Sequence, residues 1–326
     1  MRDPADFVIV DGPTATMYCG SHAAGHIGQI LLVGPDNTIQ WARAEESVED
    51  FDPWCEAVVL IDVRHRVLAL YGELGMSWFE GVLTPSTFEL QYAYRAAYYA
   101  LLAQAWPGWE LQWAYEGMDD IVRYLGDRYR GDNYGPGPTL SEPWYDRSPV
   151  YVDPESDNPG DSLLVTHAVE PGAPLRAYHL YNDENSAFGI GATLATALPP
   201  TGLVTELPYP PTSGLHLDLG ARHAMVWTIR ELAGLRSDWP RLWPGWQLEF
   251  HNDRYETQLA RCDGRLFILE PDMASAWDHL TRWATPGMTA TARSQVRHTP
   301  RWPALVCPPR RDGRRRAAPR QHSRDA

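Results

Sequence analysis

The sequence predicts an α+β fold of two pseudo-repeated domains, each a mostly antiparallel sheet with one or two packed helices. The hexapeptide Trp-Pro-Gly-Trp-Glu-Leu at 106–111 recurs at 243–248, with Gln in place of Glu. Strand candidates precede the first helix candidate without the alternation that marks parallel βαβ units. A stretch rich in Gly, Pro, Asp and Asn separates the two copies. Together these features indicate a diverged internal duplication.

We divide the chain at its changes in composition. Residues 1–130 form the first repeat, 131–160 a Gly/Pro-rich linker, 161–292 the second repeat and 293–326 an Arg-rich tail that we expect to be disordered. A chain of 326 residues is long enough for two cores of ordinary size.

The first repeat is expected to begin with strands and to end with helices. Strands are predicted at 7–10, 27–33, 38–42, 57–63 and 67–71, and the Gly-Pro-Asp-Asn turn at 34–37 should join the second and third as a hairpin. A capping box at Ser86 and Glu89 predicts the start of a helix, which Pro107 ends. A strand from Leu111 and a short helix at 121–125 should follow.

The second repeat shows a similar series. Strands are predicted at 162–166, 175–181, 202–207, 215–219, 247–250 and 266–269. Helices are predicted at 224–234, near 255–260 and from Asp272 onward.

The charge distribution limits the choice of partner. The chain carries −14, but the ten Arg and two Asp from Arg293 onward contribute +8, so residues 1–292 carry −22. An acidic body repels nucleic acid and favours a basic protein or a cationic small molecule. Nucleic acid is expected to associate only through the tail at Arg310–Arg316. The apolar runs are of strand length and the first residues lack a signal-peptide pattern, so we expect a cytoplasmic protein without membrane contact.

The best catalytic candidates are two Asp…Arg-His groups. Asp62 and His65 lie near the end of one predicted strand, and Asp218 and His223 lie near the end of another. The two groups align if the second contains an insertion of two residues. A carboxylate that orients an imidazole raises its basicity, while the neighbouring Arg64 or Arg222 can hold an anion. These residues also suit a surface turn in which the aspartate is a cap.

A metal site and an aromatic site are further alternatives. Cys19, His22 and His26 have a Cys-x2-His-x3-His spacing that offers three ligands to zinc, although the neighbouring glycines suit a simple loop. Trp109 and Trp246 are candidates for ligand stacking, against the alternative that they fill the core. No complete nucleotide-binding or nucleophile-elbow motif is present.

These observations favour a non-catalytic intracellular binding or regulatory protein without a cofactor. Its acidic, aromatic-rich body would recognise a basic protein or cationic ligand. The alternative is a metal-dependent, hydrolase-like enzyme that uses a His/Asp/Cys site.

Overall fold

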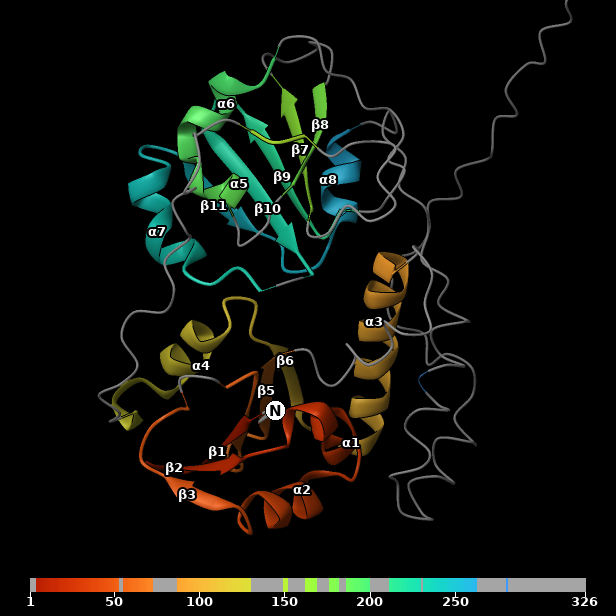
Figure 1. Cartoon of the computed structure of the whole chain (residues 1–326), viewed down its shortest axis with the longest axis vertical. Helices are drawn as coiled ribbons and strands as arrows, with labels where there is room; N and C mark the ends of the chain where they lie inside the picture. Colours follow the sequence, from red (N-terminus) through yellow and green to blue (C-terminus); the bar gives the residue numbers. More distant parts are fainter. Residues whose placement is uncertain are drawn as a thin grey trace, which may run out of the picture.

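The computed structural model describes residues 4–52, 55–72, 87–129, 149–151, 162–168, 176–181, 186–199, 211–229, 231–262 and 280. Two sheets lie one above the other in this part of the chain (Figure 1). Most of the predicted linker, the tail, the capping box, the strands at 202–207 and 266–269 and the start of the helix at Asp272 lie outside the described residues.

The first sheet has six strands in the order β3-β2-β1-β4-β5-β6. They are β1 (Ala5–Asp11), β2 (Thr14–Gly20), β3 (Glu46–Val48), β4 (Ala57–Asp62), β5 (Val67–Gly72) and β6 (Glu110–Trp113). The pairs β1–β4 and β5–β6 are parallel, and the other neighbours are antiparallel.

The second sheet has the same topology over five strands, in the order β11-β10-β9-β7-β8. They are β7 (Ser162–Ala168), β8 (Arg176–Tyr181), β9 (Ser213–Asp218), β10 (His223–Thr228) and β11 (Gln247–Phe250). The pairs β7–β9 and β10–β11 are parallel, as are their counterparts in the first sheet. The α+β class and the repeat are therefore confirmed, although the sheets are mixed.

Helices cover both faces of each sheet (Figure 1). In the first repeat, one face carries α1 (Ile27–Leu31), α2 (Pro35–Ala42) and α3 (Thr87–Ala105), and the other carries α4 (Met118–Leu125). In the second repeat, α5 (Ser186–Gly189), α6 (Leu194–Ala197) and α7 (Leu235–Leu242) lie opposite α8 (Glu256–Arg261). Short 3-10 turns at Ala24–His26, Gly126–Arg128 and Gly191–Thr193 complete the described helical structure. Because both faces are covered, every residue of β4 is buried.

Three of the predicted elements are wrong. Residues 27–33 and 38–42 do not form a hairpin, because they belong to α1 and α2. Pro35 starts α2, where a missing N–H is tolerated, and Asp36 in the first turn complements the helix dipole. The helix predicted at 224–234 is also wrong: β10 ends at Thr228, and the helix that precedes the second tetrapeptide is α7.

The described part of the chain contains no helix that is both long enough and apolar enough to cross a membrane.

Candidate functional site

The predicted Asp62–His65 pair is formed at the β4–β5 turn. The Asp62 side chain is 1% exposed, and its Oδ2 lies 3.0 Å from His65 Nδ1 and 3.0 Å from the Tyr124 hydroxyl, which donates to it. Its Oδ1 accepts the His65 backbone N–H at 2.8 Å, and Arg128 Nη1 lies 3.5 Å from Oδ2. Burial opposes ionisation, but the hydrogen bonds from His65 and Tyr124 lower the pKa of Asp62 below its usual value. The result is a fixed carboxylate beside an imidazole that is 61% exposed.

The second hairpin keeps the aspartate but not the pair. Asp218 ends β9 and its Oδ1 accepts the Ala221 N–H at 2.9 Å. His223 lies opposite Asp218 in the β9–β10 register, and its Nε2 lies 3.2 Å from Glu249. The register places Asp62 opposite Val67 across a turn of the same length. The insertion assumed in the sequence alignment is therefore wrong, and His223 is the counterpart of Val67 rather than of His65.

An arginine links each hairpin to the neighbouring tetrapeptide. Arg66 and Arg222 hold the same turn position with φ angles of 54° and 49°. Their carbonyls accept the first N–H after each tetrapeptide at 2.8 and 2.9 Å. Gly108 and Gly245 both have a φ of +77°, and a Cβ on either would lie 3.5 or 3.4 Å from the arginine Nη1. Arg222 therefore has a structural role, whereas Arg64 is simply exposed in its turn.

The tryptophans of the tetrapeptides pack against the two cores. Trp106 and Trp243 are fully buried, and their indole N–H groups donate to carbonyls of α1 and α5 at 2.6 and 3.3 Å. The rings of Trp109 and Trp246 stand edge-on to them, with centroids 4.9 and 5.4 Å away. Trp109 and Trp246 are half-buried, so a role in ligand stacking stays a prediction.

The three residues of the predicted zinc site lie in different environments. Cys19 lies on β2 beside the buried carboxyl of Asp6, and burial together with Asp6 raises the pKa of its thiol to about 12. His22 and His26 are exposed in the segment that follows. Among the described residues, no three His, Cys, Asp or Glu side chains are arranged to hold a metal ion.

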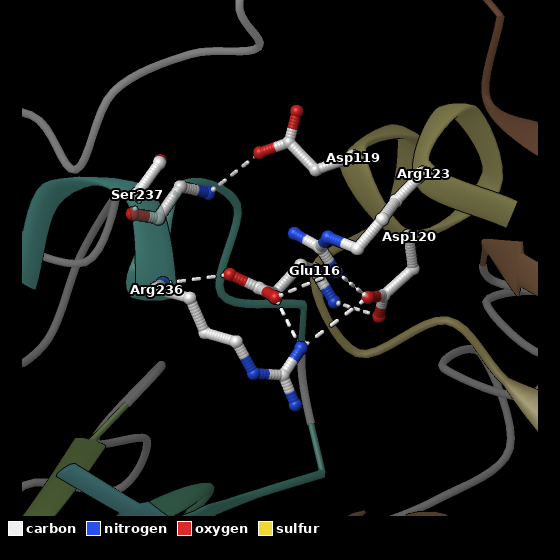
Figure 2. A network of polar contacts seen from close by, with 7 residues as sticks. Glu116, Asp119, Asp120, Arg123, Arg236 and Ser237 are labelled. Atoms are coloured by element: carbon white, nitrogen blue, oxygen red, sulfur yellow. Dashed lines mark hydrogen bonds and ion pairs between the residues drawn. The ribbon is translucent and has the colours of Figure 1, made fainter. Parts of the chain in front are cut away.

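The seam between the repeats holds a polar network that the sequence did not indicate (Figure 2). Glu116 follows β6 and its carboxylate is fully buried. Its Oε1 accepts the Arg236 backbone N–H at 2.7 Å, while its Oε2 pairs with Arg236 Nη1 and lies 3.2 Å from Arg123 Nη1. Asp119 accepts the Gly234 N–H at 3.1 Å. The start of α4 is thereby joined to the start of α7.

Carboxylates outnumber guanidinium groups at this seam. Asp120 Oδ1 lies 3.4 Å from Arg236 Nη1, in addition to its ion pair with Arg123. Glu231 as a whole is exposed, but its carboxylate packs against Gly117. A Cβ on residue 117 would overlap Glu231 Oε1. Desolvation there, together with the charges of Asp119 and Asp120, raises the pKa of Glu231 to about 7. The described carboxyl groups of the seam therefore lie close enough to affect one another's ionisation.

The structure does not join the candidates into one centre. No hydrogen bond or ion pair among the described residues connects Asp62 or His65 with Asp218 or His223. The acidic residues at 116–120 stand out in the sequence just before a predicted helix. Their partner Arg236 could not be recognised, because it lies 120 positions away from Glu116.

Comparisons of the chain with protein-family models, with curated proteins and with solved structures found no match.

Proposed function

We propose that this chain is a non-catalytic binding protein that recognises a basic protein or a cationic ligand, with the acidic seam between the repeats as its contact surface. The observation that carries the proposal is the meeting of Glu116 and Asp120 of the first repeat with Arg236 of the second, close to the Glu231 carboxylate of the second repeat. The interface between two domains is also a common place for a ligand site.

Several properties of the seam support a cationic partner. Glu116, Asp119, Asp120 and Glu231 lie near the guanidinium groups of Arg123 and Arg236, and no described basic side chain forms an ion pair with Glu231. The rings of Tyr115 and Phe250 meet edge-on at 5.8 Å across the same boundary. Carboxylates beside aromatic rings suit lysine, arginine and other organic cations.

The test is fluorescence anisotropy with a labelled Arg-rich peptide and an acidic peptide of equal length, on the full chain. We expect the basic peptide alone to bind, with an affinity that falls as salt rises. Glu231→Gln should weaken binding about 2- to 5-fold, as expected for one partly exposed ion pair. Asp11→Asn, a change at an exposed carboxylate of β1, is the matched control and should bind like wild type. Equal affinity for both peptides, or an unchanged Glu231→Gln variant, would contradict the proposal.

A hydrolase-like activity at His65 is the second candidate. Its support is the 3.0 Å contact between Asp62 and His65 Nδ1, which orients an exposed imidazole. Zinc analysis of the purified chain, with His22→Ala as the comparison variant, tests the metal-dependent form. Hydrolysis of an activated ester that persists equally in His65→Gln would rule out His65 as the base.

A further inference from the structure

Arg95 on α3 is a buried cation at the boundary of the two repeats. It is 5% exposed, and its Nη1 donates to the Ile229 carbonyl of the second repeat at 2.7 Å. Its guanidinium carbon lies 3.9 Å from the centroid of the Trp113 ring and 4.7 Å from that of Tyr115. These contacts use one donor atom and the faces of the guanidinium group.

The remaining edge of the guanidinium group has no partner in the part of the chain that the structure describes. Nε and Nη2 are shielded from solvent, and neither has a hydrogen-bond partner among the described residues. These two nitrogens form one side of the guanidinium plane, and their N–H groups make the fork that holds two oxygens of one carboxylate or phosphate. A buried cation whose donors are unpaired is costly, so an anion at this edge would be strongly favoured.

A second donor without a described partner belongs to the same helix. Tyr99 lies four positions after Arg95, on the same side of α3, and its ring centroid is 6.2 Å from that of Trp113. Its hydroxyl is buried and also has no partner in the described part of the chain. Asp253 lies near Tyr115 and Tyr99, but among the described residues it is not bonded to Nε or Nη2 of Arg95.

This arrangement is special to the first repeat. The tetrapeptides align the ends of α3 and α7, which have 19 and 8 residues. Arg95 therefore lies in the part of α3 that α7 lacks, and this part reaches the second repeat. The extra turns of α3 bring the guanidinium group to the seam.

We propose that Arg95 and Tyr99 form a binding site for a small oxyanion, a carboxylate or a phosphate, held by the Nε/Nη2 fork and the Tyr99 hydroxyl. This site uses donors that the proposed function does not, although Tyr115 borders both sites. Because the fork is enclosed where α3 meets Ile229, a bound oxyanion would stabilise the contact between the repeats. Ligand binding and thermal stability are then linked.

The test is thermal unfolding of the full chain in inorganic phosphate, in acetate and in chloride at equal ionic strength. One oxyanion should raise Tm above the chloride value, on the order of 3 °C at saturation. A response to phosphate alone or to acetate alone identifies the source of the oxyanion. Arg95→Lys, which keeps the charge but loses the fork, should abolish this response, and Tyr99→Phe should reduce it. Arg64→Lys is the matched control, because Arg64 is exposed in the first repeat.

Two results would overturn the proposal. One is an equal Tm in all three salts for wild type, and the other is an undiminished oxyanion response in both Arg95→Lys and Tyr99→Phe. If Arg95→Lys fails to fold, Tyr99→Phe still decides, since it removes only one hydroxyl. Glu231→Gln should keep the oxyanion response, so failure of the cation-binding proposal can be recognised independently.

Discussion

Replacement of Glu116 by Gln is expected to weaken the contact between the repeats. The carboxylate is fully buried, accepts bonds from the backbone and the guanidinium group of Arg236, and forms an ion pair with Arg123. Charge-assisted hydrogen bonds contribute about 1.5–3 kcal/mol each, and loss of one partner from a buried pair costs about 3–5 kcal/mol. The side chains of Arg123 and Arg236 are 51% and 45% exposed, so water can replace part of what they lose. We therefore expect Glu116→Gln to lower the free energy of unfolding by about 2–4 kcal/mol.

Urea unfolding followed by tryptophan fluorescence measures this change, with Asp11→Asn as the control at an exposed carboxylate. A double-mutant cycle with Arg236→Gln should give a coupling energy above about 1 kcal/mol, because the two side chains are in direct contact. A Glu116→Gln variant within about 0.5 kcal/mol of wild type would refute the reasoning, since it would show that the network does not hold the repeats together.

Three further predictions concern the interiors of the repeats. Asp62→Asn should cost about 1–3 kcal/mol in urea unfolding, because the buried Asp62 carboxylate accepts several hydrogen bonds. Asp218→Asn should cost less, because the Asp218 carboxylate accepts the backbone N–H of Ala221 in an exposed turn; equal costs would contradict this. Gln258→Ile should lower the free energy of unfolding by about 2–5 kcal/mol, because it leaves buried partners of the Gln258 amide unpaired. Ile121→Val, at the corresponding position of α4, should lower it by only about 0.5–1.5 kcal/mol. Burial lowers the pKa of His216 from 6.5 to about 4, so the folded state binds fewer protons than the unfolded state and stability should fall as pH drops from about 6.5 towards 4. His216→Asn should flatten this part of the stability–pH curve, and an unchanged curve would argue against a buried neutral imidazole.

The sequence was sufficient for the class of the fold because turns and repeats are local signals. The repeated tetrapeptide, the strand at β4 and the short helix α4 were all predicted. The errors arose where local signals were ambiguous. Residues 27–31 are apolar on several sides because α1 is buried against the sheet, and β10 lacks polar alternation because helices cover both faces.

The site could be predicted only where its members are close in sequence. Asp62 and His65 are three positions apart, so a capping aspartate and its imidazole were recognisable. Glu116 and Arg236 meet only because the two repeats dock, and nothing in the sequence near Glu116 indicates that partner. The role of Arg95 is not evident in the sequence for the same reason, because the residues that it contacts, Ile229 and Trp113, belong to different repeats.

The two repeats also differ on the face covered by α4 and α8. The tetrapeptide spacing pairs Ile121 with Gln258, and the strand register pairs Leu60 with His216. The first repeat has an apolar cluster beneath α4 that includes Ile121 and Leu60. The second has a buried network in which Gln258 binds Thr166 at 2.8 Å and Thr166 Oγ1 lies 2.9 Å from His216 Nδ1.

This divergence has a physical consequence. An apolar cluster tolerates exchanges of similar volume, whereas a buried network requires that every donor and acceptor be matched. The tetrapeptide face is preserved in both copies by the same hairpin arginine, the same glycine conformation and the same buried indole. Differences in function between the repeats should therefore be sought beneath α8 and at the seam, rather than at the repeated tryptophans.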